Sequence, residues 1–115
     1  MPMFIVHTNV KKGDIPEKFF TEATSLLATE LGKPSSFIHV QVCPDQLMTF
    51  GGTDEPCANI TLHCIGVVCP EKNREMAPKL SEFIESQLGI KKNRFYININ
   101  DLARPYCIWD GKTFG

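Results

Sequence analysis

The feature that most constrains the fold is an internal repeat, which appears when the sequence is slid along itself by 57 residues. Leu31-Gly32 then falls on Leu88-Gly89. Before each of these pairs, apolar residues recur at helical spacing. Glycine commonly follows a helix, and a proline followed by Glu-Lys, as at Pro16 and Pro70, suits the first turn. The repeat therefore predicts two amphipathic helices, each ended by glycine.

Apolar, β-prone segments flank both expected helices. Met3 to Val6 and Ile60 to Val68 precede them, and the alternating segments Phe37 to Val42 and Phe95 to Ile99 follow them. A strand-helix-strand crossover places its two strands parallel. The sequence thus predicts an α+β fold in which duplicated β-α-β units form a four-stranded mixed sheet with two helices on one face. The repeats lie at about 1-57 and 58-115 of a single domain, residues 1-115.

Two shorter strands are also expected, at Leu47 to Phe50 before a Gly-Gly turn, and at Cys107 to Trp109 before Asp110-Gly111. Alternation in the main strands directs one set of side chains toward the helices: Ile38, Val40, Val42, Phe95, Ile97 and Ile99. The opposite face carries polar side chains: His39, Gln41, Tyr96, Asn98 and Asn100. This face is equally compatible with a pocket or subunit contact and with a solvent-exposed surface.

Charge and hydropathy exclude several classes of partner. Twelve basic and thirteen acidic residues give a net charge of -1, without the basic excess that nucleic-acid binding requires. No apolar stretch approaches the ~20 residues that span a bilayer, and the start of the chain lacks a signal-peptide pattern. We therefore expect no nucleic-acid partner, no membrane association, and synthesis as a soluble cytoplasmic protein.

Cysteine and histidine spacing indicates neither a disulfide framework nor a metal site. The five cysteines are an odd number without a Cys-x-x-Cys pair, which favours free thiols. His63, Cys64 and Cys69 lack the paired spacing of a zinc site, and neighbours in a strand point to opposite faces. No metal or cofactor is expected.

Proline at the second position identifies a candidate catalytic base. Initiator methionine is readily removed before proline, so we expect the mature chain to start with Pro2 and to carry a free secondary amine. The pKa of a chain-terminal amine is about 7.7–8.0, and an apolar environment or a neighbouring ammonium lowers it. The alternative is that Pro2 is only a permissive second residue.

Pro2, the duplicated unit and the segment Pro44 to Gly52 together resemble the macrophage migration inhibitory factor family of the tautomerase superfamily. Further matches run along the whole chain, among them Gly32-Lys33-Pro34 and Tyr96-Ile97-Asn98. The resemblance implies the family's duplicated β-α-β fold and its homotrimer, with a small-molecule pocket between adjacent subunits.

The resemblance also implies two activities. One is keto-enol tautomerisation of phenylpyruvate, 4-hydroxyphenylpyruvate and D-dopachrome, of the phenylpyruvate tautomerase and L-dopachrome isomerase type, with Pro2 as general base. The other is a cytokine-like role, in which the protein is secreted without a signal peptide and binds invariant-chain and chemokine receptors. The alternative is a receptor-binding cytokine homologue with vestigial catalytic activity.

The same resemblance assigns the other site residues. Lys33 is expected to hold the substrate carboxylate and to disfavour protonation of Pro2, and the main-chain amide of Ile65 is a further polar contact. Side chains from the neighbouring subunit are Tyr96 and Asn98, and the pocket wall comprises Met3, His63, Trp109 and Phe114. The alternatives are a solvated cation for Lys33, a hydrogen-bonded strand histidine for His63, and core packing for Met3, Trp109 and Phe114.

Several positions depart from the family pattern. Cys57-Ala58-Asn59-Ile60 retains only the first cysteine of a Cys-x-x-Cys pair, so thiol-disulfide oxidoreductase activity is not expected. Asn100, Cys107 and Ile108 change the expected pocket rim and should shift its substrate preference. Cys107 is expected near the pocket mouth, where it would be open to thiol reagents.

Overall fold

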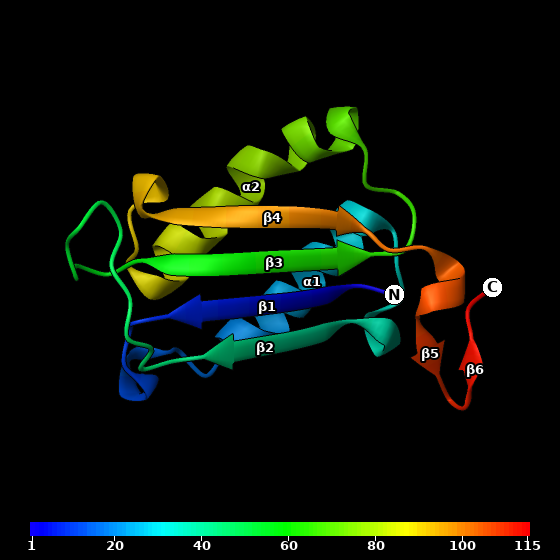
Figure 1. Ribbon diagram of the computed structural model, residues 1–115, viewed down its shortest axis with the longest axis horizontal. Helices are drawn as coiled ribbons and strands as arrows, with labels where there is room; N and C mark the ends of the chain where they lie inside the picture. The colour runs from blue at the N-terminus through cyan, green and yellow to red at the C-terminus, as the bar shows by residue number, and fades with distance from the viewer.

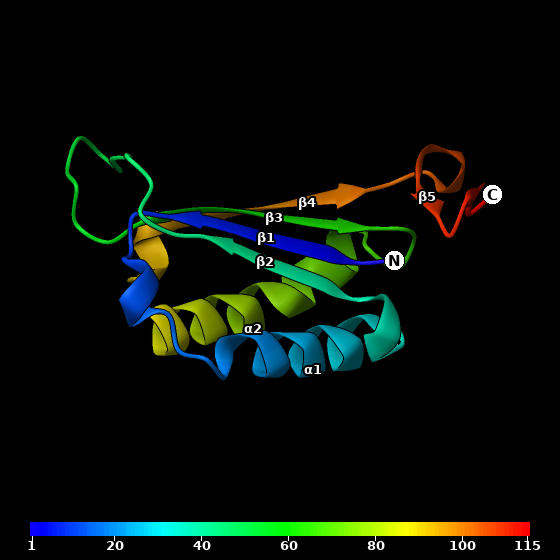
Figure 2. The same ribbon diagram turned by 90° about the horizontal axis from the view of Figure 1, so that it is seen from below.

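The computed structural model describes residues 1–115, and it contains the duplicated unit that the sequence predicts. The first unit is β1 (Met3–Thr8), α1 (Phe19–Leu31) and β2 (His39–Cys43). The second is β3 (Ala58–Cys64), α2 (Pro70–Leu88) and β4 (Phe95–Asp101). The strands form one sheet in the order β2-β1-β3-β4 (Figure 1). Both helices cover the same face of it, which confirms the predicted architecture (Figure 2).

The sheet is mixed because the two units join antiparallel. Within each unit the strands are parallel, β1 with β2 and β3 with β4. Between the units, β1 pairs antiparallel with β3, from Met3 opposite His63 to Thr8 opposite Ala58. The central strands are therefore the first strands of the two units, and the edge strands are the second.

Helix ends follow the sequence signals with one exception. Gly32 and Gly89 end α1 and α2 in the left-handed conformation, with φ of 62° and 69°, which glycine adopts at little cost. Pro70 opens α2, and the Cys69 sulfur accepts a hydrogen bond from the Lys72 N–H at 3.5 Å. Pro16 is not in the first turn of α1; it forms the preceding turn, where its carbonyl accepts from the Phe19 N–H.

The hydrophobic core lies between the sheet and the helices. Phe4 and Val6 of β1 and Ile60 and Leu62 of β3 are buried against it, and alternate residues of β2 and β4 pack on its edge. Burying each such side chain contributes about 1.5–3 kcal/mol. The five residues whose side chains are predicted to face away from the helices are all exposed: His39, Gln41, Tyr96, Asn98 and Asn100.

Several strand bounds differ from the sequence prediction, and one predicted strand is absent. β3 ends at Cys64 rather than Val68, because Gly66 and Val67 take positive φ values of 70° and 71° and turn the chain. β2 begins at His39, because residues Ser35–Phe37 form the 3-10 helix η2. The strand expected at Leu47 to Phe50 is wrong.

The segment after β2 is instead held by a turn and by Arg94. Phe50 and Thr53 form an isolated bridge around the Gly-Gly turn. Arg94 donates hydrogen bonds through all three of its guanidinium nitrogens, to the carbonyls of Phe50, Thr53, Glu55 and Pro56. Hydrogen bonds from the Arg94 side chain, rather than strand pairing, therefore hold this segment in place.

The tail contains the expected strand and turn. β5 (Ile108–Trp109) pairs antiparallel with β6 (Lys112–Thr113) as a hairpin outside the main sheet, beside the start of the chain (Figure 1). Neither α1 nor α2 combines the length and apolar character needed to cross a membrane.

Replacing Thr8 with valine should destabilise the fold. Thr8 is fully buried, its hydroxyl donates to the Cys57 carbonyl at 2.7 Å, and it accepts from the Val10 N–H at 3.1 Å. Valine keeps the shape and leaves both backbone groups unsatisfied, so Thr8→Val should lower the free energy of unfolding in urea by about 1–3 kcal/mol. Thr61→Val is the control, because Thr61 is half-buried in β3 and its hydroxyl makes no hydrogen bond. Equal stability of the two variants would contradict the prediction.

Candidate active site

The start of the chain is fixed at one end of the sheet. Pro2 is fully buried, and its carbonyl accepts a hydrogen bond from the His39 N–H at 3.0 Å, which ties it to the start of β2. Met1 is half-buried and acylates the Pro2 nitrogen. The chain-terminal amine therefore lies where β1 and β2 begin and where β3 and β4 end.

Three segments distant in sequence meet at this amine. A hollow of about 180 Å³ is lined by Met1, by Lys33, Pro34 and Phe37 after α1, by Ile65 after β3, and by Arg104 and Phe114 from the tail. Gly32 ends α1 in the left-handed conformation and turns the chain, which places Lys33 at the hollow. Ile65 is 5% exposed and immediately precedes the turn that ends β3. This hollow brings together the chain start, Lys33, Ile65 and Phe114.

A second hollow, of about 310 Å³, adjoins the first and shares Met1 and Phe37 with it. Met3, Trp109 and Ile108 line it, together with Ser36, Ile38 and His39. The ring of Phe37 lies 5.0 Å from that of Trp109 and 6.4 Å from that of Phe114, both edge-on. Aromatic side chains therefore form the wall between the two hollows.

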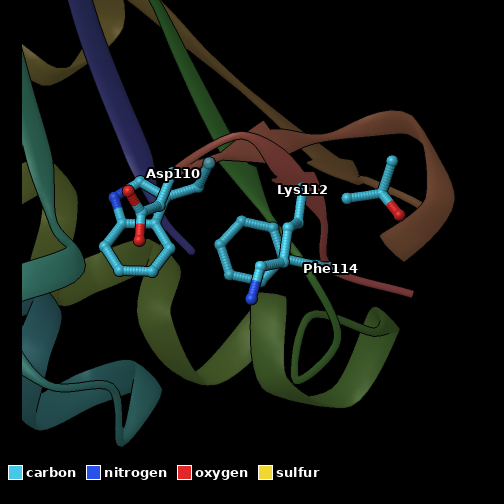
Figure 3. A pocket seen from close by; sticks show the side chains of 5 residues that line it. Asp110, Lys112 and Phe114 are labelled. Carbon is cyan, nitrogen blue, oxygen red and sulfur yellow. The ribbon is translucent and has the colours of Figure 1, made fainter.

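A third hollow, of about 250 Å³, is on the tail hairpin itself and is drawn in Figure 3. Asp110, Lys112 and Phe114 project around it, with Trp109 and Thr113 completing the lining. It includes neither the terminal amine nor Lys33. The candidate site is therefore the pair of hollows at the chain start, which contain a nucleophilic or basic group.

The surroundings of the terminal amine favour its neutral form. Burial lowers the pKa of the Met1 amine below the ordinary value for an amino terminus, and the nearby Lys33 ammonium lowers it further. Burial also raises the pKa of the Cys64 thiol, which keeps this neighbouring group neutral. Lys33 forms no ion pair within the chain. Its charge is thus available to the amine and to an anionic ligand.

The turn after β3 presents an unused backbone donor. The Asp101 carboxylate accepts from the Gly66 N–H at 3.2 Å, and the Leu102 N–H donates to the Cys64 carbonyl at 2.9 Å. These bonds hold the turn against the end of β4. The Ile65 N–H between them makes no hydrogen bond within the chain, which suits a polar contact with a ligand.

Three of the expected site residues lie on the open face of the sheet. His63 is opposite Met3 and half-buried. Tyr96 packs against Phe50, with ring centroids 5.1 Å apart, and Asn98 donates to the Asn59 side chain at 3.3 Å. Because Tyr96 is level with His7, it is four residues along the sheet from Met3, roughly 13 Å at about 3.3 Å per residue. One chain alone does not bring Tyr96 to its own amine.

Sequence reasoning does not place Pro34, Phe37 or Arg104 in the first hollow, and it misjudges Cys107 nearby. The β-prone run from Phe37 to Val42 predicts a strand for Phe37, and no motif distinguishes Arg104 in the loop after β4. Cys107 is only 8% exposed, so the expectation of a thiol open to reagents is wrong. The chain packs Cys107 beneath the tail hairpin, where its carbonyl accepts from the Phe114 N–H.

Comparison with known proteins identifies the family. The family model described as "Macrophage migration inhibitory factor (MIF)" matches residues 1–115. Macrophage migration inhibitory factor of Mus musculus is 46% identical over 114 residues, covering 99% of each chain. The homologue of Trichinella spiralis is 39% identical, covering 99% of this chain and all of that protein.

Solved structures agree with the sequence match. That of the factor from Trichinella spiralis has a TM-score of 0.96 at 38% identity, covering 97% of this chain and 99% of that one. A homologue from Prochlorococcus marinus has a TM-score of 0.91 at 29% identity, covering 98% and 99%. The fold and the site at the chain start define a small β-α-β protein with a tuned terminal amine. The chain belongs to the macrophage migration inhibitory factor family, which is known for tautomerase activity.

Replacing Lys33 with glutamine should raise the pKa of the Met1 amine. Removing a nearby positive charge favours the protonated amine, so its pKa moves up toward the ordinary value. Only part of the shift should be lost, because burial is its larger cause. An NMR titration of the amine in the Met1-containing chain measures the change. Lys11→Gln, beyond the far end of β1, should leave it in place, and an equal response to both substitutions would contradict the assignment.

Proposed function

We propose that the protein is a keto-enol tautomerase in which Pro2, once Met1 is removed, is the general base. The observation that carries the proposal is the terminal amine, which shares a hollow with Lys33 and whose pKa is lowered by burial and by that cation. A lowered pKa favours the unprotonated amine, which is the form that abstracts a proton. Removal of Met1 makes the Pro2 nitrogen the terminal amine. Burial and the Lys33 charge should then lower its pKa in the same way.

Aromatic α-keto acids fit the lining of the two hollows. We propose phenylpyruvate, 4-hydroxyphenylpyruvate and D-dopachrome as test substrates. Lys33 and the Ile65 N–H are available to the carboxylate, while Met3, Trp109 and Phe114 supply apolar wall. Pro2 removes a proton from the carbon beside the ketone, and the C–H electron pair forms the C=C bond as the carbonyl oxygen gains charge. That oxygen takes a proton to give the enol, and the reverse steps regenerate the ketone. No cofactor is required.

We propose further that the site is completed in a homotrimer. The open sheet face is polar and uncovered, and large apolar side chains such as Leu47, Tyr106 and Ile108 are exposed in the single chain. Assembly buries such side chains. In the trimer, Tyr96 and Asn98 of one subunit would line the pocket of the next, and His63 its wall.

Pro2→Gly should abolish tautomerisation of 4-hydroxyphenylpyruvate, followed by absorbance. Glycine supplies a primary and more mobile amine in place of the fixed pyrrolidine, so we expect at least a hundredfold loss of kcat/KM. Protein mass must show that Met1 is absent. Insertion of alanine between Met1 and Pro2 is the matched control: it keeps the proline and acylates its nitrogen, and it should be equally inactive. Turnover by the insertion variant would rule out Pro2 as the base.

Subunit mixing tests the composite site. Pro2→Gly and Asn98→Ala are each expected to be weakly active as homotrimers. Co-refolded in equal amounts, they form mixed trimers in which about a quarter of pockets combine an intact Pro2 with an intact Asn98 from a neighbour. Activity should therefore exceed that of either parent several-fold. Activity equal to the average of the parents would show that Asn98 serves its own chain or none.

A receptor-binding role is the second candidate, and family membership supports it. We propose secretion without a signal peptide, alongside a cytoplasmic pool, and binding to receptors of the invariant-chain and chemokine classes. Pro2→Gly separates the two roles, since signalling that survives it does not use the base. No turnover in the unmodified protein together with receptor binding would favour a cytokine homologue with a vestigial site.

A further inference from the structure

Positive charge is concentrated at the first hollow. The terminal amine, Lys33 and Arg104 all lie on it, and no aspartate or glutamate does. The whole chain has a net charge of only -1, so this is a local arrangement rather than a property of the composition. Uncompensated cations around a hollow favour an anionic ligand.

Arg104 is held in place but keeps most of its hydrogen-bonding capacity. Its Nε donates to the Phe114 carbonyl at 3.0 Å, and it makes no other side-chain hydrogen bond or ion pair. The two outer nitrogens of the guanidinium are therefore free. Arg94 is the contrast within the same chain, because all three of its nitrogens donate to backbone carbonyls.

The acidic group at the end of β4 does not neutralise this site. Asp101, at the end of β4, accepts from the Gly66 N–H and forms no ion pair with Lys33 or Arg104. Arg104 is also among the cations that lower the pKa of the terminal amine, consistent with its position beside it. When the amine is neutral, Lys33 and Arg104 leave two positive charges, and one carboxylate compensates only one of them.

We propose that Arg104 determines specificity by binding a second anionic group, so that the site prefers α-keto acids with two carboxylates. This inference rests on the proposed tautomerase function. Lys33 takes the carboxylate beside the ketone, and the free edge of the Arg104 guanidinium takes the other in a two-point contact. An aromatic ring bearing that second carboxylate lies against Phe37 and Phe114, which line the same hollow.

Binding without turnover tests the inference directly. Trp109 is the only tryptophan and lines the adjoining hollow, so its fluorescence reports ligand binding. The probes are benzoate and the 1,3- and 1,4-benzenedicarboxylates. At least one dicarboxylate should bind about tenfold more tightly than benzoate, as one charged hydrogen-bonded contact allows. Arg104→Gln should remove this preference and Arg104→Lys should retain part of it. Arg74→Gln, which removes the same charge from an exposed site on α2, should keep it.

Turnover distinguishes failure of the inference from failure of the proposed function. The ratio of kcat/KM for 4-carboxyphenylpyruvate to that for phenylpyruvate should fall about tenfold in Arg104→Gln. Equal losses for both substrates, or no loss for either, would overturn the specificity role. A dicarboxylate preference in binding without Pro2-dependent turnover would support the anion site and reject the tautomerase.

Discussion

Antiparallel pairing between β1 and β3 is the interaction on which the rest of the structure depends. Each β-α-β unit has only two strands, and a two-stranded sheet by itself is marginally stable at best. The pairing from Met3–His63 to Thr8–Ala58 makes one sheet wide enough for both helices. It also makes the start of β1 and the end of β3 neighbours. The amine and Ile65 meet for this reason.

The electrostatics of the site follow from the same topology. Because β1 and β2 are parallel, α1 must bring the chain back to the end of the sheet where β1 begins. The turn after α1 therefore places Lys33 at that end. The amine is then both partly buried and close to a cation, and both effects favour its neutral form. The position of the amine in the fold, partly buried and near Lys33, therefore lowers its pKa.

Much of the fold is predictable from the sequence because periodicity reports it directly. The repeat, the two Leu-Gly helix ends and the alternation in β2 and β4 gave the elements and the faces of the sheet. Errors arose where local conformation opposes an apolar pattern. Val67 is β-branched yet takes a positive φ, and Leu47 is apolar yet fully exposed.

The candidate site is less predictable from the sequence than the fold, because periodicity gives no information about contacts between distant segments. Lys33, Ile65 and Phe114 were expected together only through resemblance, Arg104 was missed, and the role of Tyr96 and Asn98 stays a prediction because it needs a second copy.

The tail hairpin stands apart from the hydrophobic core. No residue after Phe95 belongs to the buried cluster that holds the sheet and helices together. The hairpin is instead attached by the contacts of Phe37 with Trp109 and Phe114, and by the Arg104 bond to the Phe114 carbonyl. Substitutions there would reshape the wall of the two hollows at the chain start without opening a cavity in the hydrophobic core. Under the proposed function, substitutions in the last dozen or so residues could therefore change ligand preference, while the stability of the fold depends on a different part of the chain.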